Sequence, residues 1–277
     1  MRVFIVLILI LSYVGIVNGQ NSDKKNPQVY RLNYAFEIPA SVGLYIVNYY
    51  GLQILKKKDP LDSLRVMNLN KNNVWCFDRI ALEQTSSQRQ SAQNISDWGQ
   101  NIAIFTPILL AIDKDIRQDW FEVALLYLEA QAINTNLYTW GGPMFTTRIR
   151  PVAYYDDVPM LERTARGNTD SFFSGHTSAT ATASFFMAKV ISDYHPELGA
   201  KKWYLFAAAL GPPVFVGFFR YNGLRHFPTD IIMGTAIGAA VGVLVPHLHK
   251  ITNKNNKNLS IVPYTGNYSG LLISLRF

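Results

Sequence analysis

Long apolar runs separated by short polar segments dominate the hydrophobic pattern of this chain. The pattern predicts helices over Ala35–Leu55, Trp98–Ile112, Trp120–Trp140, Ser174–Tyr194, Trp203–Phe219 and Ile231–Leu248. Pro212 and Pro213 predict a kink or break inside the fifth run, because proline lacks the amide hydrogen that a helix interior uses. In the last run Gly234, Gly238 and Gly242 recur every fourth residue, which predicts a face for close helix packing in a membrane or in a tightly packed soluble core.

These runs predict an all-α fold, an antiparallel helical bundle whose short connections give up-and-down topology. The alternation over Leu259–Phe277, with turn residues near Gly266, adds a small C-terminal β-hairpin. Ser96 and Asp97 are candidates to cap the helix that begins at Trp98. The predicted organisation is a signal peptide at 1–19, a helical and irregular N-terminal region at 20–97, a helical core at 98–248 and a tail at 249–277.

The first nineteen residues have the pattern of an export signal. Arg2 precedes an apolar run over Val3–Leu11 that extends to Val17, and Val17-Asn18-Gly19 ends in small residues suited to cleavage. The run is short for a membrane span. We therefore expect a cleaved signal peptide and an exported protein, with an uncleaved anchor as the alternative.

Composition leaves a membrane protein and a soluble protein both open. Of the 277 residues, 49% are apolar and only 16% are charged, yet the mean hydropathy is a modest +0.06. The formal charge of +7 suits nucleic acid, an anionic membrane surface or anionic substrates. No basic helix interleaved with aromatic residues occurs, which disfavours nucleic acid. The single cysteine, Cys76, excludes an intrachain disulfide.

The first group of candidate catalytic residues lies between the last two predicted helices. Pro228 suits a first helical position, which places Asp230 in the first turn, where the helix dipole favours a carboxylate. His226 lies four residues before Asp230, so we expect its ring to donate a hydrogen bond to that carboxylate. This arrangement leaves the other ring nitrogen free and more basic. Arg220 adds a fork-shaped cation suited to phosphate, so this stretch predicts half of a phosphate-processing site.

A second stretch, Ser174-Gly175-His176, opens a predicted helix. Ser174 can cap the helix, and Gly175 lets backbone amides approach an anion. The helices on either side of the turn near 195–202 are each about 24 Å long at 1.5 Å per residue, so the chain returns to the level it left. His176 and Arg220 should therefore lie at the same end of the bundle.

A third stretch supplies two more cations. Arg148 and Arg150 follow the helix that ends near Trp140, and that helix also arrives at this end of an up-and-down bundle. Three segments that are distant in sequence are thus predicted to share one rim.

Together the three stretches resemble the type 2 phosphatidic acid phosphatase superfamily, which includes bacterial acid phosphatases, lipid phosphate phosphatases and vanadium haloperoxidases. Its motifs are Lys-x6-Arg-Pro, Pro-Ser-Gly-His and Ser-Arg-x5-His-x3-Asp. The matching residues are Arg150-Pro151 in the first, Ser174-Gly175-His176 in the second, and Arg220, His226 and Asp230 in the third at full spacing. The resemblance covers roughly residues 120–248.

Three positions depart from these motifs. Pro143 stands where the first motif has lysine, Phe173 replaces the proline of the second and Phe219 the serine of the third. The missing lysine removes one charged contact to phosphate, for which Arg148 or Arg166 are the candidate substitutes.

The resemblance implies a role for each matching residue. His226 would attack phosphorus to form a phosphohistidine with Asp230 orienting it, and His176 would act as general acid and then as base. Phosphate would be held by Arg150, Arg220, Ser174 and Gly175, with Arg148 as a further candidate. No metal or cofactor is implied.

The favoured function is therefore a phosphatase acting on a phosphate monoester or pyrophosphate of a membrane lipid, of lipid A, phosphatidylglycerol phosphate or polyprenyl pyrophosphate type. The alternative is a soluble, secreted, nonspecific acid phosphatase; a vanadium haloperoxidase or a catalytically degenerate membrane protein is less favoured. Lys201-Lys202 and the basic tail Lys250–Lys257 suit the cytoplasmic side. We therefore expect an inner-membrane protein with a periplasm-facing site, or else a soluble periplasmic or secreted one.

Overall fold

Helices make up almost all of the regular structure in this computed structural model, which describes residues 28–251, 259–265 and 269–275. The longer helices are α2 (Tyr34–Leu55), α4 (Arg89–Phe105), α6 (Trp120–Gly141), α8 (Gly175–Tyr194), α9 (Lys202–Ala209), α10 (Gly211–Asn222) and α11 (Pro228–His249). Short α-helices are α3 (Ser63–Met67), α5 (Lys114–Gln118) and α7 (Met160–Arg163). Short 3₁₀ helices cover Lys71–Asn73, Cys76–Leu82, Ser86–Gln88, Thr106–Ile112, Pro151–Tyr154 and Pro196–Lys201. The all-α prediction is confirmed, and the predicted signal peptide 1–19 lies outside the described residues.

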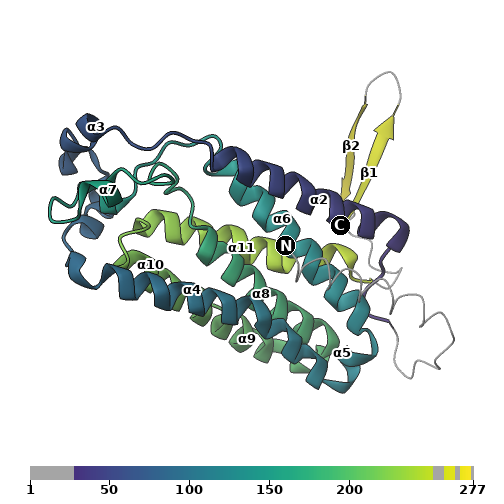
Figure 1. Ribbon diagram of the computed structural model, residues 1–277. Coiled ribbons are helices and arrows are strands. Elements are labelled where there is room, and N and C mark those ends of the chain that lie inside the picture. Colours follow the sequence, from purple (N-terminus) through teal and green to yellow (C-terminus); the bar gives the residue numbers. More distant parts are fainter. Residues whose placement is uncertain (1–27, 252–258, 266–268, 276–277) are drawn as a thin grey trace.

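Helix α8 is the centre of the bundle. It contacts α4, α6, α9, α10 and α11, whereas α2 lies along α6 on the outside (Figure 1). Alanine, serine and threonine occupy every position from 177 to 184 in the first half of α8, so its neighbours approach closely there. Larger side chains close the core farther along, where Leu126, Phe186 and Val190 are completely buried beside Val241 and Val245.

The closest helix contact is between α8 and α11. A Cβ atom at Gly238 would lie 2.1 Å from the carbonyl oxygen of Ser178, and similar contacts at Gly234 and Gly242 would be 2.4 and 2.6 Å. Only glycine fits such a backbone approach. Thr182 donates a hydrogen bond of 3.2 Å to the Gly238 carbonyl across this contact. The packing face predicted from the glycine spacing is confirmed, and it fixes the register of the two helices.

Helix α4 departs from the prediction. It begins at Arg89 rather than at Trp98, so the boundary predicted between residues 97 and 98 falls inside a helix. Ser96 and Asp97 do not cap the helix, because they lie in its middle turns. Polar residues at 93, 97 and 100 share one face of the helix, and this face interrupts the apolar pattern from which the helix was predicted.

Two other predictions are confirmed. The helix that contains Pro212 and Pro213 is broken, since α9 ends at Ala209 and both prolines lie in the first turn of α10. The C-terminal hairpin pairs β1 (Leu259–Thr265) with β2 (Ser269–Leu275) in antiparallel register.

Within the described residues, three helical stretches are long and apolar enough to cross a membrane: Ser86–Ile112, Pro196–Asn222 and Pro228–His249. The 22 residues of α11 give a helix about 33 Å long, against about 30 Å for the hydrocarbon core of a bilayer. Large apolar side chains on these stretches point outward; Trp98 is 70% exposed and Phe105 72%. Together these features support association with a membrane.

The α8–α11 contact generates a stability prediction. Gly238→Ala should destabilise the protein by about 1–3 kcal/mol, because the new methyl group overlaps the Ser178 carbonyl and forces the helices apart. Thermal unfolding of the detergent-solubilised protein measures the effect. Gly43→Ala is the matched control, since a Cβ at this α2 position meets nothing within 4 Å. Equal melting temperatures for the two variants would contradict the prediction.

Candidate functional site

The three predicted stretches meet at the end of the bundle that carries α3 and α7 (Figure 1). Backbone hydrogen bonds tie them together. The Val152 amide donates to the Leu224 carbonyl at 3.0 Å, and the Ser174 amide donates to the Asp230 carbonyl at 3.0 Å. The structure therefore brings the predicted residues into one place through main-chain contacts that do not depend on side-chain orientation.

His226 is held in one tautomer. Its side chain is buried, and Nδ1 lies 2.7 Å from the carbonyl oxygen of Ser171. A carbonyl can only accept a hydrogen bond, so Nδ1 carries the proton and Nε2 keeps its lone pair. Burial, followed by the charges of Arg150 and Arg220, lowers the pKa of His226 well below its usual value. The ring is therefore neutral and has one free nucleophilic nitrogen.

The turn before His226 has an unusual backbone. Leu224 is completely buried with a φ of 55°, in the left-handed region that residues other than glycine rarely adopt. Such a conformation costs of order 1–3 kcal/mol and persists where surrounding contacts impose it. Here the carbonyl of Leu224 accepts the hydrogen bond from Val152. This turn directs the two residues that follow, Arg225 and His226, into the site.

Asp230 does not bond directly to His226, so that prediction is wrong. The nearest distance, from Asp230 Oδ2 to His226 Nδ1, is 3.8 Å. Oδ2 instead accepts hydrogen bonds from the Ser171 hydroxyl at 2.6 Å and the Phe227 amide at 2.9 Å. Asp230 thus fixes the residue whose carbonyl orients His226. Its negative charge still lies close enough to stabilise a positively charged imidazole.

Arg148, predicted as a further candidate to hold phosphate, is paired with carboxylates in the structure. Its guanidinium donates to the carboxylates of Asp78 and Asp230 and to the Thr229 hydroxyl at 2.8 Å. It also lies over the Phe227 ring, 4.6 Å from the ring centre. Two carboxylates already neutralise this cation, so Arg148 braces the start of α11 and is not directed at a phosphate.

Asp78 is a site residue that sequence reasoning missed. It is completely buried, and besides Arg148 it accepts hydrogen bonds from the Thr229 amide at 3.1 Å and the Thr229 hydroxyl at 2.7 Å. It comes from the N-terminal region, about 150 residues before its partner, and no local pattern marks it.

Three other arginines have unused hydrogen-bonding capacity. Arg150 and Arg220 are 7% and 4% exposed. Among the described residues, Nε and Nη1 of Arg150, Nε of Arg220 and Nε of Arg225 are buried without a hydrogen-bond partner. Burial and the neighbouring Arg150 and Arg220 lower the pKa of Arg225 to about 9. Buried cations with unsatisfied donors favour an anion with several acceptor atoms. Arg225 was not predicted as a site residue.

His176 and Arg220 share one carboxylate. Asp97 Oδ1 lies 2.9 Å from His176 Nε2 and accepts a hydrogen bond of 3.0 Å from Arg220, which also donates to Ser96 Oγ at 3.3 Å. Burial lowers the pKa of His176 to about 4, although Asp97 acts to raise it. Asp97 was missed as a site residue because it lies 79 residues from His176, on the polar face of α4.

A cavity of about 370 Å³ opens beside these groups. It is lined by Gln93, Asp97, Gln100, Asn101, His176, Arg220 and Arg225. Ser174 caps α8, accepting a hydrogen bond of 3.4 Å from the Thr177 amide. The amides of Gly175 and His176 therefore lie at the positive end of the α8 dipole, where an oxyanion is favoured.

A cation does lie beside Pro143, the position at which the resembled motif has lysine. It is Lys58, just beyond α2, which donates to the Pro143 carbonyl and forms an ion pair of 2.9 Å with Asp170. The Asp170 carbonyl in turn accepts a hydrogen bond of 3.3 Å from Arg150. A residue that follows a different helix, α2, thus brings a positive charge to this edge of the site.

Part of the chain matches a known protein family. Residues 120–254 match the family model of the PAP2 superfamily, and this range contains α6 to α11. No curated protein sequence matches the chain. Among solved structures, the chain is similar to the crystal structure of a transmembrane PAP2-type phosphatidylglycerolphosphate phosphatase from Bacillus subtilis. The two are 18% identical with a TM-score of 0.43, over 75% of this chain and 94% of that one.

The arginine N–H groups that lack a partner among the described residues generate a binding prediction. Arg225→Gln should weaken the binding of inorganic phosphate about tenfold or more, because one charge-assisted hydrogen bond contributes about 1.5–3 kcal/mol. Isothermal titration calorimetry measures the affinity. Arg117→Gln, an exposed position on α5, should bind like the wild type. Unchanged affinity in Arg225→Gln would show that Arg225 does not contact the anion.

Proposed function

We propose that this chain, a member of the PAP2 superfamily through residues 120–254, hydrolyses a phosphate monoester or pyrophosphate of a membrane lipid. One observation carries this proposal. Near a neutral histidine whose free nitrogen is suited to attack phosphorus, buried arginine N–H groups have no hydrogen-bond partner within the part of the chain that the structure describes. The second histidine, His176, lines the adjoining cavity and can donate a proton to the leaving group.

In the first step Nε2 of His226 attacks phosphorus. A P–N bond forms while the bond to the ester oxygen breaks, and His176 gives its proton to that oxygen. The imidazole of His226 becomes positively charged. Its Nδ1 keeps its proton and donates a hydrogen bond to the Ser171 carbonyl, and the Asp230 carboxylate, 3.8 Å away, stabilises the new charge.

In the second step water attacks the phosphohistidine. His176, now neutral, takes a proton from this water, the P–N bond breaks and His226 returns to its neutral form. Arg150, Arg220 and Arg225 hold the non-bridging phosphoryl oxygens in both steps, where negative charge accumulates. A phosphate dianion beside His176 raises its pKa from the low value of the free site, so the substrate itself helps to protonate the general acid.

The outer surface supports a lipid substrate. Helix α4 supplies Gln93, Asp97 and Gln100 to the cavity, and its opposite face is apolar and exposed. A headgroup could thus enter the polar cavity while its acyl or polyprenyl chain stays beside α4. Lipid A, phosphatidylglycerol phosphate and polyprenyl pyrophosphate types all fit this arrangement.

The proposed location is an inner membrane with the site facing the periplasm. Helix α8 begins at the site, and the turn that follows it, with Lys201 and Lys202, therefore lies at the other end of the bundle. Lysines at that end follow the tendency of cytoplasmic segments to be basic.

The proposed function predicts a loss of phosphate release in His226→Ala of about a thousandfold or more, because no other nucleophile occupies its place. Release is measured from lipid phosphates and pyrophosphates in mixed micelles and from a water-soluble aryl phosphate. His195→Ala is the matched control, since His195 pairs with Asp113 and Glu197 away from the site.

Equal release from His226→Ala and wild type would overturn the proposed enzyme. Hydrolysis of the aryl phosphate alone would favour a nonspecific acid phosphatase instead of a lipid phosphatase.

A second prediction concerns pH. The pKa of His176 is about 4 in the free site, so its protonated fraction falls as pH rises above that value, and kcat/KM should decline with it. Asp97→Asn removes the carboxylate that raises this pKa, so the decline should begin at lower pH. Asp113→Asn, which removes one of the two carboxylate partners of His195, should leave the profile unchanged. An unshifted profile in Asp97→Asn would show that His176 is not the general acid.

A further inference from the structure

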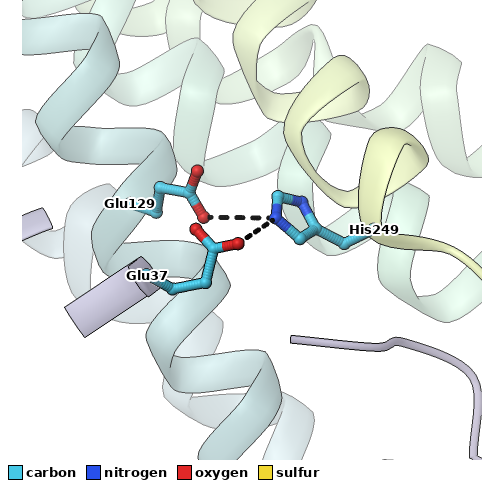
Figure 2. A group of neighbouring side chains, drawn as sticks. All are labelled: Glu37, Glu129 and His249. Carbon is cyan, nitrogen blue, oxygen red and sulfur yellow. Dashed lines mark hydrogen bonds and ion pairs between the residues drawn. The ribbon is translucent and has the colours of Figure 1, made fainter. Parts of the chain in front are cut away.

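A second group of ionisable side chains lies on the same bundle, away from the phosphate site. Glu37 is in the first turn of α2, Glu129 is in the middle of α6, and His249 is the last residue of α11. Each offers one ligand atom, and the three atoms lie within 4.8 Å of one another. Figure 2 shows both carboxylates directed at the same ring nitrogen of His249. The side chains are only 13%, 14% and 17% exposed, respectively.

The tautomer of His249 is set by its own helix. Nδ1 lies 2.9 Å from the Val245 carbonyl, which can only accept, so Nδ1 carries a proton. Nε2 faces Glu37 Oε1 at 3.3 Å and Glu129 Oε2 at 3.8 Å. A backbone carbonyl bound to one ring nitrogen is the usual way in which a protein orients the other nitrogen toward a metal.

Three electron-rich atoms that converge need a positive charge between them. A proton on Nε2 can satisfy Glu37, but it leaves Glu129 unsatisfied. Oε2 of Glu129 is buried and has no hydrogen-bond partner among the residues that the structure describes. Within the same residues, His249 is the only basic side chain paired with either glutamate. A divalent ion would satisfy all three ligand atoms together.

The site also has suitable dimensions and surroundings. Two ligand atoms each about 2.1 Å from a tetrahedral Zn²⁺ are about 3.4 Å apart, close to the 3.3 Å between Nε2 and Glu37 Oε1. His249 ends α11, and the negative end of the helix dipole favours a cation there. Because α11 is about 33 Å long and begins at the phosphate site, this cluster lies at the opposite end of the bundle.

We propose that Glu37, Glu129 and His249 form a structural site for a divalent transition-metal ion, with Zn²⁺ as the preferred ion. An imidazole with two carboxylates suits Zn²⁺ or Mn²⁺ better than Mg²⁺, which prefers oxygen ligands and retains its waters. The ion joins α2 and α6 to the end of α11, so it stabilises the packing of the outer helix α2 against the bundle. The proposal does not depend on the phosphatase chemistry.

The test uses the full chain, purified in detergent, stripped with a chelator and titrated with ZnCl₂, with MgCl₂ in parallel. We expect one Zn²⁺ per chain by elemental analysis and a rise in Tm of roughly 5 °C or more at saturation. MgCl₂ should have little effect. His249→Gln and Glu129→Gln should lose both the bound zinc and the rise in Tm.

His247→Gln is the matched control, because His247 lies two residues earlier on α11 with an exposed side chain. It should retain zinc binding. Circular dichroism of the metal-free variants identifies any variant that fails to fold, and Glu37→Gln then provides the second test of the site. The proposal would be overturned if the wild type bound no zinc, or if His249→Gln and Glu129→Gln bound as much zinc as the wild type. A shared proton would then hold the cluster together.

Discussion

The direct backbone contact between α8 and α11 is the constraint on which the rest of the structure depends. Gly238 lies where any Cβ would be 2.1 Å from the Ser178 carbonyl, so the two helices have one permitted register. That register places the first turn of α8 beside the first turn of α11, where the Ser174 amide bonds to the Asp230 carbonyl at 3.0 Å. Both helix N-termini, with their positive dipole ends, therefore point into the same site.

The charges at this site fall into two classes with different roles. Arg148 lies between Asp78 and Asp230, so its charge is neutralised and the three residues act as a brace for the start of α11. Arg150 and Arg220 are buried, yet each keeps at least one N–H group without a partner among the described residues. Keeping such donors unpaired costs stability, and an oxyanion recovers that cost when it binds. The proposed phosphatase uses this second class.

Sequence periodicity predicted the helices well, and its main error is informative. The start of α4 was placed nine residues late, because its polar face interrupts the apolar run. That face is polar because it lines the cavity and carries Asp97, the carboxylate shared by His176 and Arg220. A helix that serves a polar site loses the apolar pattern from which helices are predicted.

The sequence by itself determined the helices, the glycine face of α11 and the segments that would meet at one end of the bundle, because these follow from periodicity and helix length. Only the tertiary structure decided which groups bond to one another. It directed Asp230 to Ser171 instead of His226, and it joined Glu37 to His249 across 212 positions of the chain. Such pairings depend on how each helix is rotated about its axis when it packs, and local sequence does not encode that rotation.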